Sequence, residues 1–282
     1  MAERRPPLWA SIVCLGLPGL FVLAPLMVFV TLSFRSVENG EVKDTFGFEN
    51  YLAFAADGNL VHVYLRTVLI CLAASAANVC LGWLVALFIS RRSARLRFFL
   101  VMLLTLPVFA SYIIKVYAAR GILGGKGVLN EALLHLGLVS EPITALVFNY
   151  NAIFIVFVII YLPFAVIPIY LSMERIPGNL GLASADLGGS PWHEVIHLVL
   201  PLSMPGIVIA SMFSFLMTFG DFVTPQLVGG VDGFMFGRVV FTQFGLSLNW
   251  PYGAALAVIL LATTALVVGA IGSLFARAKV TL

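Results

Sequence analysis

Long apolar runs separated by short polar segments make up most of the 282 residues. Six runs carry no charged side chain, at 8–34, 67–90, 98–114, 143–173, 198–220 and 239–276. A helix that crosses a bilayer needs about 20 apolar residues, so each run is long enough or nearly so. The last run is longer, and we expect its helix to begin at Asn249, Trp250 and Pro251. The pattern predicts an all-α, polytopic membrane protein with six transmembrane helices in one domain over 1–282.

A polar segment at 174–202 separates the fourth and fifth apolar runs. Within it, residues 179–187 carry apolar side chains at helical spacing. Gly188 and Gly189 follow, and glycine is the usual residue just beyond a helix end. We therefore expect a short helix that stops at this glycine pair.

A second short helix is expected directly after the glycine turn. Ser190 is a good N-cap, and Pro191 suits the first helical position because no N–H is needed there. The helix should run to about Leu200, where Pro201 and then Pro205 are expected to break it. Two short helices at the membrane surface form a surface to which a partner protein can bind.

The composition agrees with a membrane protein and indicates its orientation. Hydrophobic residues make up 61% of the chain and charged residues 10%, and the mean hydropathy is +1.06. Four arginines lie in the short segment 91–97, whereas the segment 35–57 carries five carboxylates and two basic residues. Because short cytoplasmic loops are rich in Lys and Arg, we expect both termini and the 174–202 segment to be cytoplasmic. The net charge of +3 reflects this bias and does not point to nucleic acid.

Several classes of function are disfavoured by the sequence. The glycine-rich segment 121–127 has no Ser or Thr after Lys126, so it is not a phosphate-binding loop and we expect no ATP hydrolysis. Asp221 is the only candidate carboxylate within the spans, so no aspartate pair is available for proteolysis. The cysteines, Cys14, Cys71 and Cys80, lack metal-ligand spacing. We expect no catalytic residue, metal, cofactor or cleaved signal peptide.

Polar side chains follow one face of the fifth predicted span. Ser211, Ser214, Thr218 and Asp221 are spaced by three, four and three residues. At 1.5 Å per residue, Asp221 lies about 24 Å beyond Pro205, in the outer half of the membrane. One interpretation is a carboxylate in a transport path for a cationic solute. The other is that Asp221 caps a helix end or pairs with a basic residue, while the hydroxyls allow close helix packing.

The polar segment resembles the EAA loop of ABC importer permeases. The resemblance rests on the run Ala-Ser-Ala-Asp-Leu-Gly and on Leu-Pro and Pro-Gly-Ile elements at the family's spacing. In that family the loop forms coupling helices that dock into a groove on a separate cytoplasmic ATPase. The matching coupling positions here are Ala183, Ser184, Asp186, Gly188, Leu200, Pro201, Pro205 and Gly206.

Two positions in this segment depart from the family pattern. Leu182 stands where the family usually has glutamate, and Ser184 stands where it has alanine. Loss of the acid should weaken a polar contact to the ATPase, while apolar packing and Gly188 preserve the docking. The effect of Leu182 stays open.

Other segments resemble the spermidine/putrescine-type permeases, and in particular the first of that system's two permeases. The run 220–225 (GDFVTP), followed by Gly229 and Gly230, is similar to that group's signature in span five. Further similar elements lie at 127–131, 162–164 and 249–251. The resemblance extends over about 8–276.

The resemblance implies a type I ABC importer permease-like bundle in the bacterial inner membrane. It implies a second permease subunit, two cytoplasmic ATPase subunits and an extracytoplasmic solute-binding protein as partners, within the lipid bilayer. The implied solute is a small cationic polyamine. The candidate path residues are Ser211, Ser214, Thr218 and Asp221, with the rings of Tyr161 and Phe222 adding cation–π contacts.

Alternatives to polyamine import stay open. Related permeases carry aminophosphonates, opines or ferric ion. A secondary transporter without an ATPase, or a purely structural protein, would also fit six spans. The docking segment at 174–202 disfavours the secondary transporter, because a free-standing carrier has no use for it.

Overall fold

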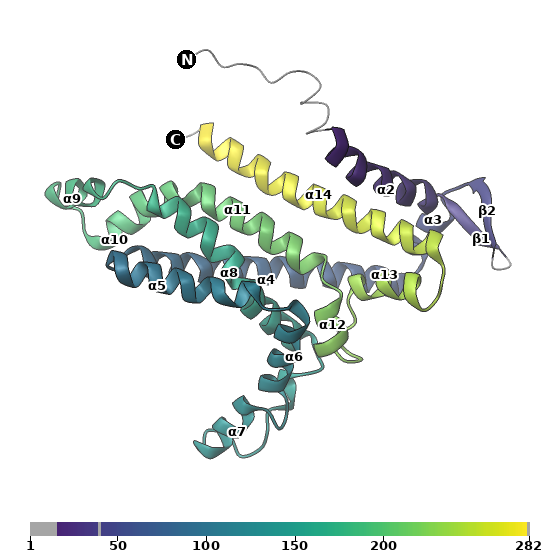
Figure 1. Ribbon diagram of the computed structural model, residues 1–282, viewed down its shortest axis with the longest axis horizontal. Helices are drawn as coiled ribbons and strands as arrows, with labels where there is room; N and C mark the ends of the chain where they lie inside the picture. The colour runs from purple at the N-terminus through teal and green to yellow at the C-terminus, as the bar shows by residue number, and fades with distance from the viewer. Residues whose placement is uncertain (1–15, 39–40, 281–282) are drawn as a thin grey trace, which may run out of the picture. The chain divides into compact units, whose positions relative to one another are not determined.

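The chain is mostly helical in the computed structural model, which describes residues 16–38 and 41–280 (Figure 1). The start of the first expected span, at 8–15, and Cys14 lie outside these residues. The elements in chain order are α2 (Leu17–Ser33), β1 (Arg35–Glu38), β2 (Glu41–Phe46), α3 (Glu49–Ala56), α4 (Gly58–Ser90), α5 (Ala94–Thr105), η2 (Leu106–Phe109), α6 (Tyr112–Leu123), α7 (Val128–His135), η3 (Thr144–Leu146), α8 (Tyr150–Glu174), α9 (Asn179–Asp186), α10 (Pro191–Glu194), η4 (Val195–Val199), α11 (Leu200–Phe219), α12 (Val223–Val228), α13 (Phe236–Gly245) and α14 (Trp250–Val280).

The described residues contain fewer complete spans than the six expected. Four helices are long and apolar enough to cross a membrane, at Gly58–Ser90, Tyr150–Glu174, Pro191–Phe219 and Trp250–Ala276. A fifth is present if the bent pair Ala94–Phe109 and Tyr112–His135, which meet at 101°, forms one span. The described part of α2 is 17 residues long. The last span begins at Trp250, as the sequence predicts.

A short hairpin corrects the all-α prediction. Strands β1 and β2 pair antiparallel, with Val37 opposite Val42 and Arg35 opposite Phe46. This segment lies between the first two apolar runs, and its backbone groups pair with one another rather than within a helix. The protein is therefore mostly helical, with one two-stranded sheet among the described residues.

Two compact units divide the chain: Met1–Val61 with Val239–Ala262, and His62–Arg238 with Thr263–Leu282. In the first unit, polar contacts join the hairpin to its neighbouring helices. The side-chain amide of Asn50 donates to the carbonyls of Ser33 (2.9 Å) and Arg35 (2.7 Å). The single transmembrane domain expected over 1–282 stays a prediction.

The core of the second unit forms where α8 packs against α4 and α11 (Figure 1). Ala86, Ala165 and Ala210 are completely buried there. A Cβ atom placed on Gly206 would lie 2.5 Å from the carbonyl oxygen of Pro168 and 2.7 Å from the Cβ of Ser172. Small residues therefore allow the backbones of α8 and α11 to approach closely, as at many helix contacts in membranes.

Pro201 and Pro205 do not end the short helix that begins at Pro191, so this expectation is wrong. One continuous helix of 29 residues covers Pro191–Phe219. Its π-turn, η4, lies directly before Pro201, and the N–H of Leu200 donates to the carbonyl of Val195 five residues back. The wider π-turn makes room for the ring of Pro201, and packed neighbours in a bundle tolerate Pro205.

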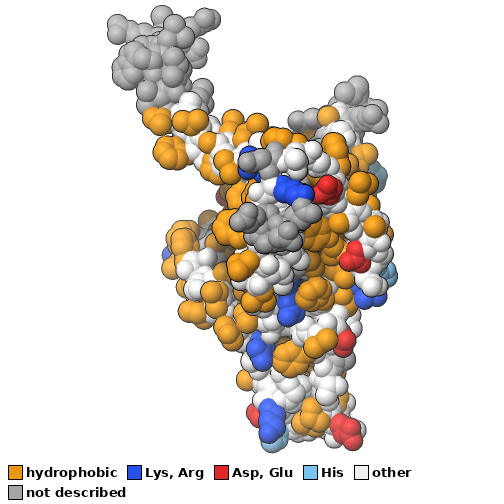
Figure 2. Space-filling view, turned by 90° about the vertical axis from the view of Figure 1, so that its right-hand side faces the viewer, with side chains coloured by type: hydrophobic (Ala, Val, Ile, Leu, Met, Phe, Trp, Pro, Cys, Tyr) orange, Lys and Arg blue, Asp and Glu red, His pale blue; other side chains and the backbone are white. Residues whose placement is uncertain are grey.

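Apolar side chains cover much of the accessible surface (Figure 2). Phe21 on α2 is 74% exposed, Phe109 after α5 is 89% exposed, and Leu266 on α14 is 71% exposed. Large exposed apolar side chains in this number are typical of surfaces that contact lipid or other subunits rather than water.

Candidate functional site

A buried carboxylate lies just beyond the end of α11. Asp221 is 7% exposed. The backbone N–H groups of Val223 and Thr224 donate to its Oδ1 atom, at 2.8 Å and 3.1 Å. Asp221 precedes Phe222, the N-cap residue of α12, and its side chain satisfies two N–H groups in the first turn of this helix. The capping alternative from the sequence therefore accounts for this oxygen.

The other carboxylate oxygen of Asp221 faces two tyrosines from other helices. The hydroxyl of Tyr112, at the start of α6, donates to Oδ2, and the hydroxyl of Tyr161, in the middle of α8, lies 3.2 Å from it. The two phenol rings stack with centroids 6.3 Å apart. The Tyr112 hydroxyl also lies 2.6 Å from Oγ1 of Thr224. Three helices thus meet at one carboxylate.

No residue in the described part of the chain forms an ion pair with Asp221. The ammonium of Lys115 lies instead near the ring of Tyr112, 5.8 Å from its centroid. A buried carboxylate is stable when hydrogen-bond donors replace its water. Here two backbone N–H groups and two hydroxyls do so. The arrangement offers a carboxylate to a cation, with the rings of Tyr112 and Tyr161 nearby.

Ser214 and the backbone carbonyl of Ser211, in the fifth span, accept hydrogen bonds from α4. The side-chain amide of Asn78 on α4 donates to Oγ of Ser214 at 3.1 Å, and Oγ of Ser75 donates to the carbonyl of Ser211 at 3.1 Å. Thr218 is buried, and its hydroxyl donates back to the carbonyl of Ser214 at 2.9 Å. The Asn78 and Ser75 contacts join α4 to α11, in the part of α11 that precedes Asp221.

The structure brings Tyr161 and Thr218 close to Asp221 in the fold but leaves the ring of Phe222 36% exposed. Tyr112 and Thr224 belong to the cluster, and the sequence reasoning missed both. Tyr112 begins a new helix, α6, with Ser111 as its N-cap. No helical spacing in the sequence therefore links Tyr112 to the other members of the cluster. Thr224 carries a usable signal, because an aspartate three residues before it is typical of a helix cap.

A second candidate site is the surface formed by α9, the glycine turn and α10, which we call the coupling surface (residues 179–194). The N–H of Gly189 donates to the carbonyl of Ser184 at 2.8 Å, and the N–H of Gly188 donates to that of Ala185 at 2.9 Å. Gly188 has a φ of +81°. This is a Schellman ending, in which glycine takes the left-handed conformation.

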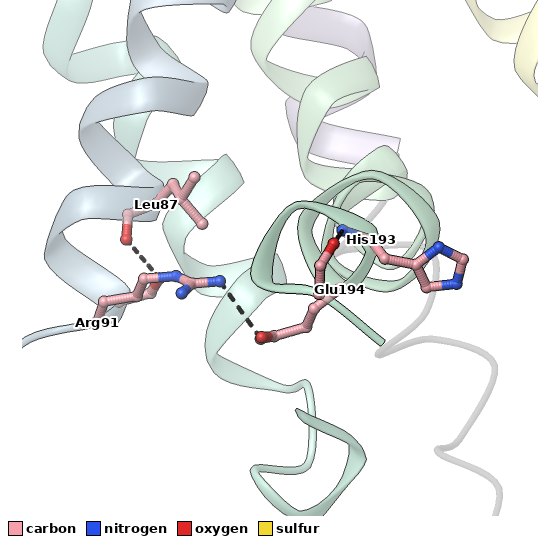
Figure 3. A network of polar contacts seen from close by, with 6 residues as sticks. Leu87, Arg91, His193 and Glu194 are labelled. Carbon is pink, nitrogen blue, oxygen red and sulfur yellow. Dashed lines mark hydrogen bonds and ion pairs between the residues drawn. The ribbon is translucent and has the colours of Figure 1, made fainter. Parts of the chain in front are cut away.

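The second half of the coupling surface is capped and tied to α4 (Figure 3). Oγ of Ser190 accepts from the N–H of His193 at 3.2 Å, which confirms the predicted cap. Arg91 at the end of α4 pairs with Glu194, with 3.3 Å between Nη2 and Oε1. The pair is partly exposed, so it orients the segment more than it stabilises it.

The coupling surface presents apolar side chains. Leu182 is 70% exposed, Leu187 is 90% exposed and Trp192 is 75% exposed. A cavity of about 310 Å³ lies beside Leu187; its lining residues are Leu180, Ala183, Ser184, Leu187, Gly189, His193, His197 and Leu198. Exposed apolar groups beside a hollow are typical of a surface that another protein covers.

The predicted coupling positions lie in two places. Ala183, Ser184, Asp186 and Gly188 lie on or beside α9, whereas Leu200, Pro201, Pro205 and Gly206 follow along α11. Gly206 is buried against α8. The first set forms the surface, and the second set forms the helix that leads away from it.

His193 and His197 resemble the histidine pair of a zinc hydrolase helix, because Glu194 follows the first. Their rings stack at 4.1 Å, and Figure 3 shows the His193 ring pointing away from the Arg91–Glu194 pair. Glu194 is engaged by Arg91, and the described residues contain no group of three metal ligands.

Comparison with known proteins identifies the family of the chain. Residues 78–280 match the family model described as binding-protein-dependent transport system inner membrane component. The chain belongs to this family. It is therefore a multi-pass inner membrane protein and the permease subunit of an ABC importer, which implies a separate ATPase and a periplasmic binding protein.

Curated relatives agree over most of the permease's length. The spermidine/putrescine transport system permease protein PotB of Escherichia coli (strain K12) is 34% identical over 242 residues, covering 86% of this chain and 87% of its own. PotB of Haemophilus influenzae is 31% identical, covering 88% and 86%. The inner membrane ABC transporter permease protein YdcU of Escherichia coli (strain K12) is 37% identical, covering 68% and 65%.

Solved structures of ABC importers share the permease's fold. A chain of a bacterial transporter that imports the acidic polysaccharide alginate superposes with a TM-score of 0.76, covering 96% of this chain and 95% of that one. A chain of the methionine transporter MetNI gives a TM-score of 0.53, covering 78% and 96%. Their identities of 15% and 17% make this a likeness of fold.

Proposed function

We propose that this permease forms half of the membrane path of a polyamine importer, with spermidine or putrescine as its solute. The carrying observation is the Asp221 cluster: a buried carboxylate that has no cationic partner among the described residues and accepts from the hydroxyls of two tyrosines. The relationship to PotB proteins supports the same solute class. A polyammonium chain carries the complementary charge, and aromatic faces stabilise such cations.

The proposed assembly is a type I importer with a second permease subunit, so that the pair encloses the path. Six spans per permease and cytoplasmic termini are part of this proposal, supported by the arginine-rich segment 91–97. The segment 174–202 is the proposed coupling loop, with two cytoplasmic ATPase subunits on its outer face. The exposed apolar side chains of Leu182, Leu187 and Trp192 support a protein contact there.

The proposed mechanism uses α10, η4 and α11 as one lever. The helix Pro191–Phe219 begins in the coupling surface, and Asp221 follows two residues after its end. At 1.5 Å per residue, the two ends are about 40 Å apart. Closure of the ATPases on bound ATP then moves the coupling surface, and the continuous helix carries that movement to the carboxylate. The path alternates between inward-open and outward-open states as nucleotide and loaded binding protein shift their populations.

The proposed solute path is tested by replacing Asp221 with asparagine. Labelled spermidine and putrescine uptake is measured in cells that carry the gene or lack it, with ATP depleted in a parallel sample. Uptake should require both the gene and ATP, and Asp221→Asn should reduce it about tenfold or more, because a buried charge-assisted contact is lost.

Asp232→Asn is the matched control, because Asp232 is an exposed carboxylate in the segment after α12. It should transport like the wild type. Full uptake by Asp221→Asn would contradict a role for this charge in the path. Gene-dependent uptake that survives ATP depletion would favour a secondary transporter. If the gene has no effect on polyamine uptake, aminophosphonates, opines and ferric ion are tested next.

A further inference from the structure

The two oxygens of the Asp221 carboxylate have different kinds of partner. Oδ1 is held by backbone N–H groups of its own turn, at 2.8 Å and 3.1 Å. Oδ2 is held by the hydroxyls of Tyr112 and Tyr161, which come from α6 and α8. The backbone donors are fixed by α12, whereas a phenol hydroxyl can turn about its C–O bond. Oδ2 is therefore the oxygen whose donors can be exchanged.

The Tyr112 hydroxyl has a second acceptor within reach. Oγ1 of Thr224 lies 2.6 Å from it, and the hydroxyl of Tyr161 lies 3.1 Å from it. When another donor occupies Oδ2, the Tyr112 proton can turn to Thr224 without being left unpaired. Exchange is thus possible without the cost of an unsatisfied buried group.

The geometry points to a donor-exchange site: we propose that Tyr112 and Tyr161 are the resting partners of Asp221, and that an N–H group of an alkylammonium solute replaces the Tyr112 hydroxyl at Oδ2. The inference rests on the proposed function and names the chemistry of its solute. A primary or secondary ammonium has both the charge and the N–H donor that Oδ2 requires. A quaternary ammonium has the charge alone, so it does not compete for Oδ2.

The neighbouring rings favour the same class of solute. Tyr112 and Tyr161 stack with an interplanar angle of 19°, and the rings of Phe157 and Phe164 lie 5.9 Å and 6.4 Å from that of Tyr161. Phe157 is completely buried and Phe164 is partly exposed, so the aliphatic segments of a polyamine can pack on the accessible ring of Phe164 while its nitrogen contacts the carboxylate. The hydroxyls then regain Oδ2 as the solute leaves, which prevents the carboxylate from retaining it.

The change Tyr112→Phe removes the competing donor but keeps the ring. The solute should then bind more tightly and leave more slowly. Equilibrium binding of labelled spermidine to the detergent-purified permease–ATPase complex should become about tenfold tighter. In the complete transporter reconstituted with its binding protein, the maximal uptake rate and KM should both fall. A purely structural role for Tyr112 would not tighten binding.

Tyr64→Phe is the matched control, because the Tyr64 hydroxyl contacts Thr263 Oγ1 at 2.7 Å, outside the Asp221 cluster. Its binding and uptake should match the wild type. Unchanged or weaker spermidine binding by Tyr112→Phe would overturn the inference. Displacement of spermidine by its fully N-methylated, quaternary analogue at equal concentration would also overturn it. Absence of ATP-dependent polyamine uptake by the wild-type transporter would refute the proposed function itself, a result distinct from either.

Discussion

At the scale of single residues, one backbone conformation determines the shape of the coupling surface. Gly188 has a φ of +81°, and its N–H closes the end of α9 on Ala185. Residues with a Cβ atom pay about 1–2 kcal/mol in this left-handed region. The direction in which the chain leaves α9 toward Ser190 therefore depends on a residue that has no side chain.

Replacing Gly188 with alanine should weaken attachment of the ATPase. The strain favours other conformations of the turn, so α9 and α10 lose their fixed relation. We expect less ATPase to copurify with the permease and uptake to fall by about fivefold to thirtyfold, which corresponds to the strain energy. Pull-down of the tagged complex, with uptake in parallel, measures both.

Gly178→Ala is the control for this experiment. Gly178 precedes the same helix with a φ of −63°, and a Cβ atom placed on it would meet nothing within 4 Å. The Gly178→Ala variant should copurify with as much ATPase as the wild type and should take up the solute at the same rate. Equal retention of ATPase by Gly188→Ala would show that docking does not need the left-handed turn.

At the scale of elements, the contact between α8 and α11 links the coupling surface to the carboxylate. Gly206 lies at a close approach within this contact, where Pro168 O and Ser172 Cβ would lie 2.5 Å and 2.7 Å from an added Cβ. Tyr161 lies on α8, and Asp221 follows α11. A displacement between these two helices therefore changes the geometry of the Asp221 cluster.

Gly206→Ala should separate α8 from α11 and destabilise the permease by about 1–3 kcal/mol, because the added methyl meets backbone rather than a flexible side chain. The expected result is a lower thermal unfolding midpoint for the purified complex in detergent. Gly269→Ala in α14, where a Cβ would meet nothing within 4 Å, should leave the midpoint unchanged or raise it. An unchanged unfolding midpoint for Gly206→Ala would mean that α8 and α11 can move apart without a loss of stability.

At the scale of the whole molecule, the chain is one subunit of an importer. Much of its accessible surface is apolar and suited to contact with lipid or other subunits. Phe21, Phe109 and Leu266 are among its exposed apolar side chains. The four or five candidate spans among the described residues support a multi-pass arrangement. The direction in which the chain crosses the membrane follows from its charges and is a prediction.

The predicted orientation is tested with single cysteines in a background without Cys14, Cys71 and Cys80. A cysteine in place of Lys126, in the segment between α6 and α7, should react with a membrane-impermeant maleimide in spheroplasts. A cysteine in place of Asp186, on the coupling surface, should react only after the cells are lysed. The reverse pattern would invert the topology and remove the coupling surface from the reach of a cytoplasmic ATPase.

Much of the coupling surface was predictable because its signals are local. A glycine pair ends a helix and a Ser-Pro pair begins one within a few residues, so Gly188, Ser190 and Pro191 were assigned from neighbours alone. The wrong prediction at Pro201 was local as well. The π-turn η4, which ends at Val199, accommodates the ring of Pro201 within a continuous helix. This π-turn depends on packing that local sequence rules do not include.

The sequence by itself determined the membrane environment, the short helices of the coupling surface and the presence of an acidic residue near the end of the fifth apolar run. These follow from hydropathy and from residues that act on their own backbone. The tertiary structure alone decided the partners of that acid. Tyr112, Tyr161 and Asp221 are separated by 49 and 60 residues, and only the packing of α6, α8 and α11 brings their oxygen atoms together. Such long-range contacts leave no periodic signal in a single sequence. Each of the three residues belongs to a different helix, and the periodicity of one helix says nothing about its neighbours.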